Sequence, residues 1–149
     1  MTPSNGARVE SIWLKTERRG PMASVDRATL VEGIGIEGNA NRGGYRQVTL
    51  LDADAWEAAT AELGVDVDPA SRRANVLVRG VALTETGGRV LRVGGSRIQI
   101  RGETLPCDLM DEAAPGLREA LKPSWRAGAY GVVLTGGPVA IGDAVEWES

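Results

Sequence analysis

The sequence predicts a mainly β domain, barrel-like, with about seven strands and two short helical regions. Short apolar or alternating runs recur along the chain and are separated by Gly, Pro and Asp, which is typical of all-β and α+β domains. Long amphipathic helices between the strands are lacking, which disfavours the alternative of an open α/β sheet. The 149 residues show no change of composition and no repeat, so we expect one domain over 1–149.

Seven runs are candidate strands because they are apolar or alternate between apolar and polar residues. They cover residues 9–14, 47–51, 75–78, 90–93, 97–101, 130–134 and 144–147. The run 97–101 reads Arg-Ile-Gln-Ile-Arg and alternates strictly, which predicts that its two isoleucines face the core and its polar residues face outward. Seven such strands are enough to form a barrel-like sheet.

Two stretches predict helices. Residues 53–63 follow Asp52, a good N-cap residue, and are rich in alanine until Gly64 ends the helix. Residues 108–122 have leucines on one helical face, but the Pro-Gly pair at 115–116 predicts a break into two short helices.

The composition excludes several kinds of chemistry. The chain has no histidine, which removes Ser-His-Asp and Cys-His catalysis and the commonest zinc ligand. It has one cysteine, so it forms no intramolecular disulfide and no Cys-x-x-Cys site. Its two lysines, Lys15 and Lys122, do not lie near a glycine loop or strand end suited to a Schiff base, so we expect no pyridoxal phosphate.

Charge and hydropathy bound the partners and the compartment. Seventeen basic residues against 20 acidic ones give a net charge of −3, which disfavours nucleic-acid binding. No run reaches the roughly 20 apolar residues that span a bilayer, and residues 1–8 lack the apolar segment of a signal peptide. We therefore expect a cytoplasmic protein without a membrane partner.

A glycine-rich segment and a group of aspartates each have two interpretations. Residues 33–38 read Gly-Ile-Gly-Ile-Glu-Gly and match a dinucleotide-binding pattern, but residues 39–44 have the composition of a loop rather than of the helix that such a site requires. We interpret the segment as a loop in which Asn39 or Asn41 can take left-handed backbone angles. Asp52 and the nearby aspartates fit helix caps and turns better than a pair of catalytic carboxylates.

Cys107 is the strongest candidate for chemistry. It lies in Thr-Leu-Pro-Cys-Asp at 104–108, where the alternating strand has ended and the second helical region begins. A thiol at a helix N-terminus lies close to unpaired backbone amides, which favours the reactive thiolate, although Asp108 would oppose this effect if its carboxylate pointed back at the sulfur. The alternative is a buried cysteine that packs as a small hydrophobic residue.

Arginines stand at the ends of several candidate strands. Arg72 and Arg73 precede the strand at 75–78, Arg42 and Arg46 flank the glycine loop, and Arg126 precedes the strand at 130–134. A guanidinium group binds oxyanions through parallel hydrogen bonds, so arginines that converge at one barrel mouth could bind a phosphate or a pterin. Each of them taken alone fits a solvated charge better.

Several segments taken together resemble the MOSC family, named for the C-terminal domain of molybdenum cofactor sulfurases. They are Gly-Ile-Glu-Gly at 35–38, Gly-Tyr-Arg-Gln-Val-Thr-Leu at 44–50, Arg-Arg-Ala-Asn-Val-Leu-Val-Arg-Gly at 72–80, Leu-Pro-Cys at 105–107, Gly-Ala-Tyr-Gly-Val-Val at 128–133 and Gly-Asp at 142–143. They occur in the family's order and cover most of the chain from about residue 33.

The resemblance implies a strongly bent barrel, similar to the β-barrel domain of pyruvate kinase, and binding of the molybdenum cofactor. It implies that Cys107 carries persulfide sulfur or ligates molybdenum, and that Asn75 and the arginines Arg46, Arg72, Arg73 and Arg126 receive the phosphate of the pterin. Relatives divide between sulfur transfer and the reduction of N-hydroxylated compounds. A sulfur donor or a redox protein is accordingly the implied partner, and the motifs do not separate the two activities.

One departure from the family pattern bears on the chemistry. Many relatives read Gly-Asp-x-His in the glycine loop, whereas residues 38–41 of this chain read Gly-Asn-Ala-Asn. Amide side chains hydrogen-bond but do not relay protons near neutral pH. A non-catalytic β-barrel binding module therefore stands as the alternative to a cofactor-handling domain, and the exposure of the Cys107 thiol is the feature that discriminates between them.

Overall fold

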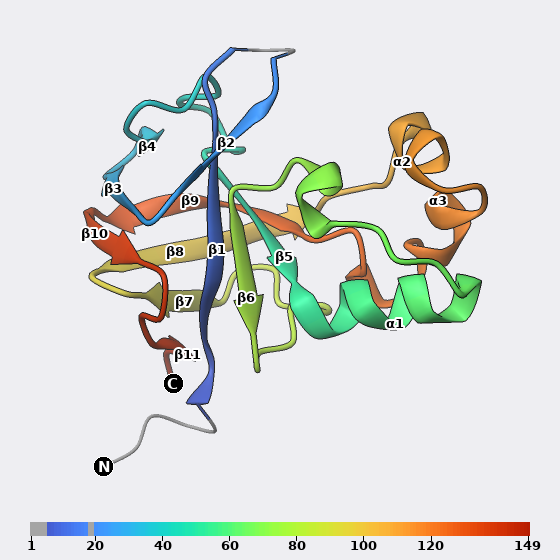
Figure 1. Cartoon of the computed structure of the whole chain (residues 1–149). Helices are drawn as coiled ribbons and strands as arrows, with labels where there is room; N and C mark the ends of the chain where they lie inside the picture. Colours follow the sequence, from blue (N-terminus) through green and yellow to red (C-terminus); the bar gives the residue numbers. More distant parts are fainter. Residues whose placement is uncertain (1–5, 18–19) are drawn as a thin grey trace.

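A computed structural model describes residues 6–17 and 20–149 of the chain, and within them the fold is mainly β (Figure 1). The strands are β1 (Arg8–Lys15), β2 (Met22–Val25), β3 (Arg27–Val31), β4 (Gly35–Ile36), β5 (Val48–Asp52), β6 (Val76–Arg79), β7 (Val90–Val93), β8 (Ser96–Glu103), β9 (Ala129–Thr135), β10 (Gly137–Ala140) and β11 (Val145–Trp147). The α-helices are α1 (Ala53–Leu63), α2 (Asp108–Ala113) and α3 (Leu117–Ala120), and the 3₁₀ turns are η2 (Pro69–Arg72) and η3 (Pro123–Trp125).

Eight of the strands form one mixed sheet in the order β11-β7-β8-β9-β5-β6-β1-β2, and β10-β3-β4 form a smaller sheet. Strands β5 and β6 are parallel, and their neighbours in the sheet pair antiparallel. The strand order ends at β11 and β2, so the sheet is not a closed barrel. An isolated antiparallel bridge between Arg8 and Ala144, with Val9 N donating to Asp143 O at 2.9 Å, nevertheless joins β1 to the segment before β11.

The prediction of a mainly β fold is confirmed, and all seven predicted segments are strands of the large sheet. The prediction of about seven strands was too low, because β2, β3, β4 and β10 are also present. These four are short, and β10 contains Pro138, which removes a backbone donor from the strand. They occupy an edge of the large sheet or form the small sheet, where local sequence gives a weak signal.

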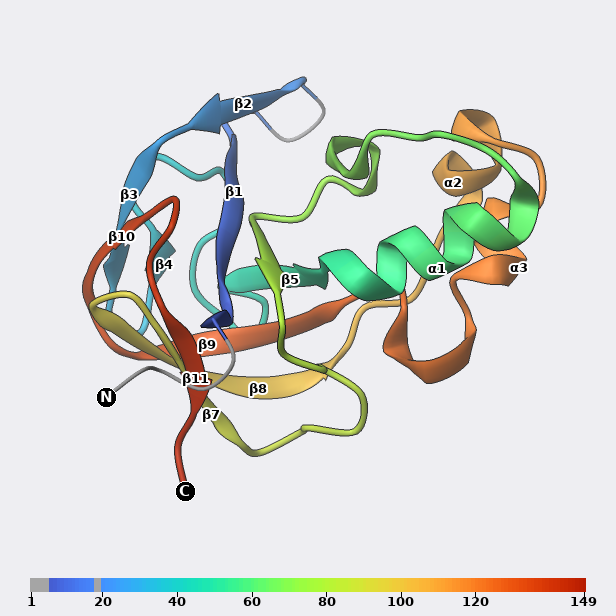
Figure 2. The ribbon, with the colours of Figure 1, turned by 60° about the horizontal axis from the view of Figure 1, so that its bottom comes forward.

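The parallel pair β5 and β6 is buried on both faces. Along β5, Leu50 belongs to the core enclosed by the strands, while Leu51 belongs to a second core beneath the helices. In β6, Val76 and Val78 join the first core and Leu77 joins the second. Burial on both faces explains the continuous apolar runs in these strands, since alternating patterns arise where only one face is buried. Figure 2 shows the helices gathered at one end of the sheet.

The predicted helices are confirmed: α1 has both predicted ends, and the second region begins at Asp108 as predicted but ends at Ala120 rather than at 122. The side chain of Asp52 accepts hydrogen bonds from Asp54 N at 2.9 Å and Ala55 N at 3.4 Å, and Gly64 ends α1 with a φ of 66°. The break at 115–116 separates α2 from α3, and Gly116 takes a φ of 90° there. None of the helices among the described residues is long and apolar enough to cross a membrane.

The alternating strand β8 faces as predicted. Ile98 and Ile100 are fully buried in the core, whereas Arg97 projects outward and bonds Glu148 near the end of the chain. The hydrogen bonds from Arg97 and then from Arg92 lower the pKa of the Glu148 carboxyl to about 2. These ion pairs hold the residues that follow β11 against the outer face of β7 and β8.

Candidate functional site

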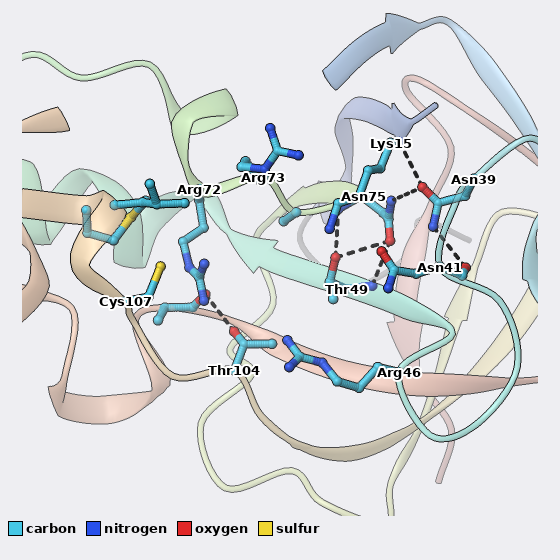
Figure 3. Close-up of a pocket in the computed structure, with 14 residues that line it drawn as sticks. Lys15, Asn39, Asn41, Arg46, Thr49, Arg72, Arg73, Asn75, Thr104 and Cys107 are labelled. Carbon is cyan, nitrogen blue, oxygen red and sulfur yellow. Dashed lines mark hydrogen bonds between the residues drawn. The ribbon is translucent and has the colours of Figure 1, made fainter. Parts of the chain in front are cut away.

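A cavity of about 290 Å³ lies between the large sheet and α2, and it collects side chains from distant parts of the sequence (Figure 3). Lys15 comes from the end of β1, Arg72 and Arg73 from the end of η2, and Cys107 from the start of α2. The loop before β5 contributes Arg46. In Figure 3, Arg72 and Cys107 lie on one side of the cavity and Lys15 lies on the other.

Four cations line this cavity, and none has a carboxylate partner among the residues that the structure describes. Within residues 6–17 and 20–149, no carboxylate oxygen lies within 4 Å of the charged nitrogens of Lys15, Arg46, Arg72 or Arg73. Burial is the largest cause of a lowered pKa at Lys15, and the charges of Arg73 and Arg46 act in the same direction. The cavity is therefore electropositive, although the chain as a whole carries a net charge of −3.

Backbone carbonyls hold Arg72 in place. Its Nε donates to Ala127 O at 2.8 Å and its Nη2 donates to Leu105 O at 3.2 Å. The carbonyl of Ala127 also accepts from Thr104 Oγ1 at 2.8 Å, so one peptide group fixes two side chains of the cavity. Burial lowers the pKa of Arg72, while the charge of Cys107 raises it, which places the thiol and the guanidinium in one electrostatic environment.

The other two arginines are held by different means. Arg73 has a φ of 63°, a left-handed conformation that is unfavourable for a long side chain, and its Nη1 donates to Gly20 O at 2.9 Å. Arg46 is exposed, and its guanidinium carbon lies 5.3 Å from the centre of the Tyr130 ring. A stacked guanidinium keeps its edge free for hydrogen bonds, so Arg46 can still contact an anion in the cavity.

The only cysteine of the chain is exposed and lines the same cavity. Cys107 occupies the N-cap position of α2, and its thiol makes no capping hydrogen bond. The carboxylate of Asp108 does not turn back to the sulfur, because it pairs with Arg118 Nη1 at 2.5 Å. The position predicted for Cys107 at a helix start is confirmed, and the alternative of a buried cysteine is wrong.

Asn75 borders the cavity, but its amide is fully used inside the protein. Its Nδ2 donates to Trp13 O at 3.1 Å and to Asn39 Oδ1 at 3.2 Å. Its Oδ1 accepts from the backbone N and the Oγ1 of Thr49, both at 3.1 Å. An amide has two donor hydrogens and two acceptor lone pairs, so these four bonds leave none for a ligand. The geometry fits a residue that positions its neighbours.

The glycine loop is anchored by Asn39. Asn39 Oδ1 accepts from Lys15 N at 2.8 Å as well as from Asn75, and Asn39 Nδ2 donates to Asn41 O at 3.2 Å. The interpretation that Asn39 or Asn41 takes left-handed backbone angles is wrong, because Gly38, Gly43 and Gly44 supply the positive φ values in this loop, at 86°, 73° and 65°. Asn41 lines the cavity.

Arg126 lies outside the cavity. Its Nη2 pairs with Glu62 at 2.6 Å and its Nη1 donates to Ala120 O at 3.0 Å, so it links α1 to the end of α3. The structure thus brings together Arg46, Arg72 and Arg73 with Asn75 and Cys107, but it does not bring Arg126 to them. Glu62, the partner that holds Arg126 away, is distant in sequence, and the motif near residue 128 gives no sign of it.

Three polar residues that line the cavity were not predicted as site residues, namely Lys15, Thr49 and Thr104. Lys15 lies outside the quoted motifs, whereas Thr49 and Thr104 lie within the segments 44–50 and 104–108 but were not singled out there. A signal for Lys15 exists in principle, since a cation that follows an apolar strand stands at the edge of a sheet. Among the described residues, no group of three or more His, Cys, Asp or Glu side chains could hold a metal ion.

The family profile of the MOSC domain matches residues 37–146, which is most of the chain. The chain belongs to the MOSC domain family. MOSC domains are known in molybdenum cofactor-binding proteins. No curated protein matches this chain at a significant level.

Solved structures share the fold of this MOSC domain. The YuaD protein from Bacillus subtilis is 20% identical with a TM-score of 0.80, and the match covers 93% of each chain. YiiM from Geobacillus stearothermophilus is 15% identical with a TM-score of 0.74, over 96% of this chain and 75% of that one. YiiM from Escherichia coli is 20% identical with a TM-score of 0.68, over 95% of this chain and 70% of that one. At these identities the likeness concerns the fold alone.

Proposed function

We propose that this MOSC domain holds the molybdenum cofactor, with the cations of the cavity on the cofactor's phosphate and Cys107 available to its metal or to a transferable sulfur. One observation carries the proposal. The cavity unites four cations without a carboxylate partner among the described residues and the one thiol of the chain.

The charge of the cavity fits a phosphate group. Partly buried cations that repel one another are destabilised in the protein alone, and an anion placed among them relieves that repulsion. Hydrogen bonds to a charged group contribute about 1.5–3 kcal/mol each. Arg72 is fixed beforehand by two carbonyls and Arg46 by its ring contact, so little side-chain ordering opposes binding.

The size of the cavity fits part of such a cofactor. Its volume of about 290 Å³ lies at the lower end of the roughly 300–1,000 Å³ found for ligand pockets. That space admits a phosphate and the adjoining portion of a larger molecule. An exposed thiol at the cavity's edge is then accessible to the rest of the ligand.

Cys107 is the only thiolate that the chain offers to molybdenum, because the chain has no second cysteine, and thiolates bind such metals well. When bound, the cofactor supplies a metal centre that exchanges oxygen or sulfur atoms and electrons with a substrate. Around it, Arg46, Arg72 and Arg73 orient the phosphate, and Asn75 and Asn39 keep Lys15 and the glycine loop in position. Asn39 and Asn41 relay no protons near neutral pH.

Two activities follow from this arrangement, sulfur transfer and the reduction of N-hydroxylated compounds, with a sulfur donor or a redox protein as partner. A non-catalytic binding module would have been favoured by a thiol buried away from every cavity, and the exposure of Cys107 in the cationic cavity supports a cofactor-handling role instead.

The test is to purify the wild type and three variants from cells that make the cofactor, and to measure molybdenum, pterin and labile sulfur per chain. The variants are Cys107→Ser, the double variant Arg46→Gln/Arg73→Gln, and Arg126→Gln as a matched arginine outside the cavity. We expect the double variant to lose pterin, Cys107→Ser to lose molybdenum or sulfur, and Arg126→Gln to match the wild type. Loss of molybdenum alone favours reduction, and loss of sulfur alone favours transfer. Equal contents in all four proteins would refute the proposal.

A further inference from the structure

We infer that Cys107 accepts a sulfur atom from thiosulfate, with the cations of the cavity binding the sulfonate end of that donor. The inference rests on the sulfur-transfer branch of the proposed function, and it names the chemical class of the sulfur donor as a small sulfane-bearing dianion. It follows from the juxtaposition of an exposed thiol with four cations that have no carboxylate partner among the described residues.

Electrostatics favour this donor over others. A thiolate repels an approaching dianion, so the reaction is slow unless positive charge offsets the repulsion. The charge of Cys107 acts on Arg72, and the charges of Arg73 and Arg46 act on Lys15, so the thiol and all four cations share one field. A neutral donor gains nothing from these charges, whereas a dianion is both attracted and oriented by them.

The reaction balances without an added oxidant or reductant. The Cys107 thiolate attacks the outer sulfur of thiosulfate, a bond forms between the two sulfurs, and the sulfur-sulfur bond of thiosulfate breaks with its electron pair leaving on sulfite. The products are a persulfide on Cys107 and a sulfite dianion. If the thiol starts protonated, its proton passes to solvent. Positive charge beside the departing sulfite stabilises the negative charge that develops on it.

The outer sulfur of a persulfide on Cys107 would also be accessible to a molecule that accepts it. Cys107 is exposed, and its neighbours Leu105 and Leu109 are 72% and 49% exposed, so no side chain of this segment closes over the thiol. A small nucleophile can therefore remove the outer sulfur and restore the thiolate. Cyanide serves as such a probe, because it takes up the sulfur as thiocyanate.

The experiment treats the purified full chain with thiosulfate, locates added sulfur by mass spectrometry and measures thiocyanate after adding cyanide. We expect wild-type protein to gain one sulfur atom on Cys107, and Cys107→Ser to gain none. In Arg46→Gln/Arg73→Gln the second-order rate constant with thiosulfate should fall about tenfold or more, and the wild-type rate should fall steeply as salt is added. Arg101→Gln is the matched control, because Arg101 also lies over a tyrosine ring, 4.8 Å from the centre of Tyr45, but does not line the cavity.

Neutral iodoacetamide separates an effect on the donor from an effect on the thiol. If the cations act on the dianion, the double variant reacts with iodoacetamide at nearly the wild-type rate. The inference is overturned if wild-type protein gains no sulfur, if the two arginine substitutions leave the thiosulfate rate unchanged, or if they slow iodoacetamide equally. If the wild-type protein gains no sulfur but still contains molybdenum and pterin when purified from cells that make the cofactor, only the thiosulfate reaction is refuted and the proposed function stands. If it also lacks molybdenum and pterin, the proposed function is refuted as well.

Discussion

Replacing Asn75 by alanine should lower the free energy of unfolding by about 3 kcal/mol. It should remove no contact to a ligand, because the Asn75 amide bonds only to groups of the protein. The side chain makes four hydrogen bonds at a position that is 5% exposed. Alanine leaves the Thr49 N–H and the Trp13 carbonyl without these partners, and each buried group that loses its partner costs about 1–3 kcal/mol. The sum is large for a single substitution but within the measured range.

Urea unfolding followed by tryptophan fluorescence measures this loss. The variant Asn75→Asp keeps the volume but places a carboxylate oxygen against the Trp13 and Asn39 oxygens, so we expect it to be destabilised as well. Asn41→Ala is the control, an exposed amide of the same cavity whose removal should change the free energy of unfolding by about 0.5 kcal/mol or less. A loss below about 1 kcal/mol in Asn75→Ala, together with weakened phosphate binding, would show that Asn75 contacts the ligand and would refute the positioning role.

Three further predictions concern charge and packing. Saturating inorganic phosphate should raise the pKa of Lys15 toward its ordinary 10.5, because a bound anion offsets the charges of the neighbouring cations. NMR of the methylated side chains of the two lysines measures this pKa. A Lys15 pKa that phosphate leaves unchanged would contradict an anion in the cavity. Glu148, with its pKa lowered to about 2, should contribute its full stabilisation above pH 4.5 and lose it as the pH falls through about 2; a Glu148 carboxyl that titrates near 4.5 by NMR would disprove the ion pairs. Gly128→Ala should lower the free energy of unfolding by about 3 kcal/mol, because the new Cβ would lie 2.3 Å from a carbonyl oxygen of β5 and the residue has a φ of 115°. Gly142→Ala is the control: its φ is 93°, no atom lies within 4 Å of the new Cβ, and the cost should be about 1 kcal/mol. Equal losses of stability in thermal unfolding of the two variants would rule out the steric argument.

The elements with a strong local signal could be predicted from the sequence. Alternation placed Ile98 and Ile100 in the core, and the cap residues Asp52 and Gly64 gave both ends of α1. Strand β10 contains a proline and β4 has two residues, so neither produces a periodic pattern. Strand β10 is stabilised by its pairing with β3, which lies far away in the sequence and outside any local window. Strand β4 pairs with β3 across a short turn, but two residues are too few to show a pattern.

The candidate site could be predicted in part. Arg72, Arg73 and Cys107 lie in contiguous motif segments, and their places at the ends of elements were visible in the sequence. Which arginines converge depends on partners that are far away, as Arg126 shows by pairing with Glu62. Lys15 reaches the cavity only because β1 lies beside β6 in the sheet. The order of strands in the sheet depends on the whole fold and not on the sequence around Lys15.

The bridge between the two ends of the described fold constrains how the protein can form. Backbone bonds join Ala7 and Val9 to Asp143 and Val145, so this ladder appears only after almost the whole segment between them has been synthesised. Contacts with so large a sequence separation slow folding, because the closure of a long loop precedes any gain from the contact. During translation, the start of β1 therefore lacks these backbone partners until residues 142–145 have been made, and unpaired strand edges of this kind favour aggregation.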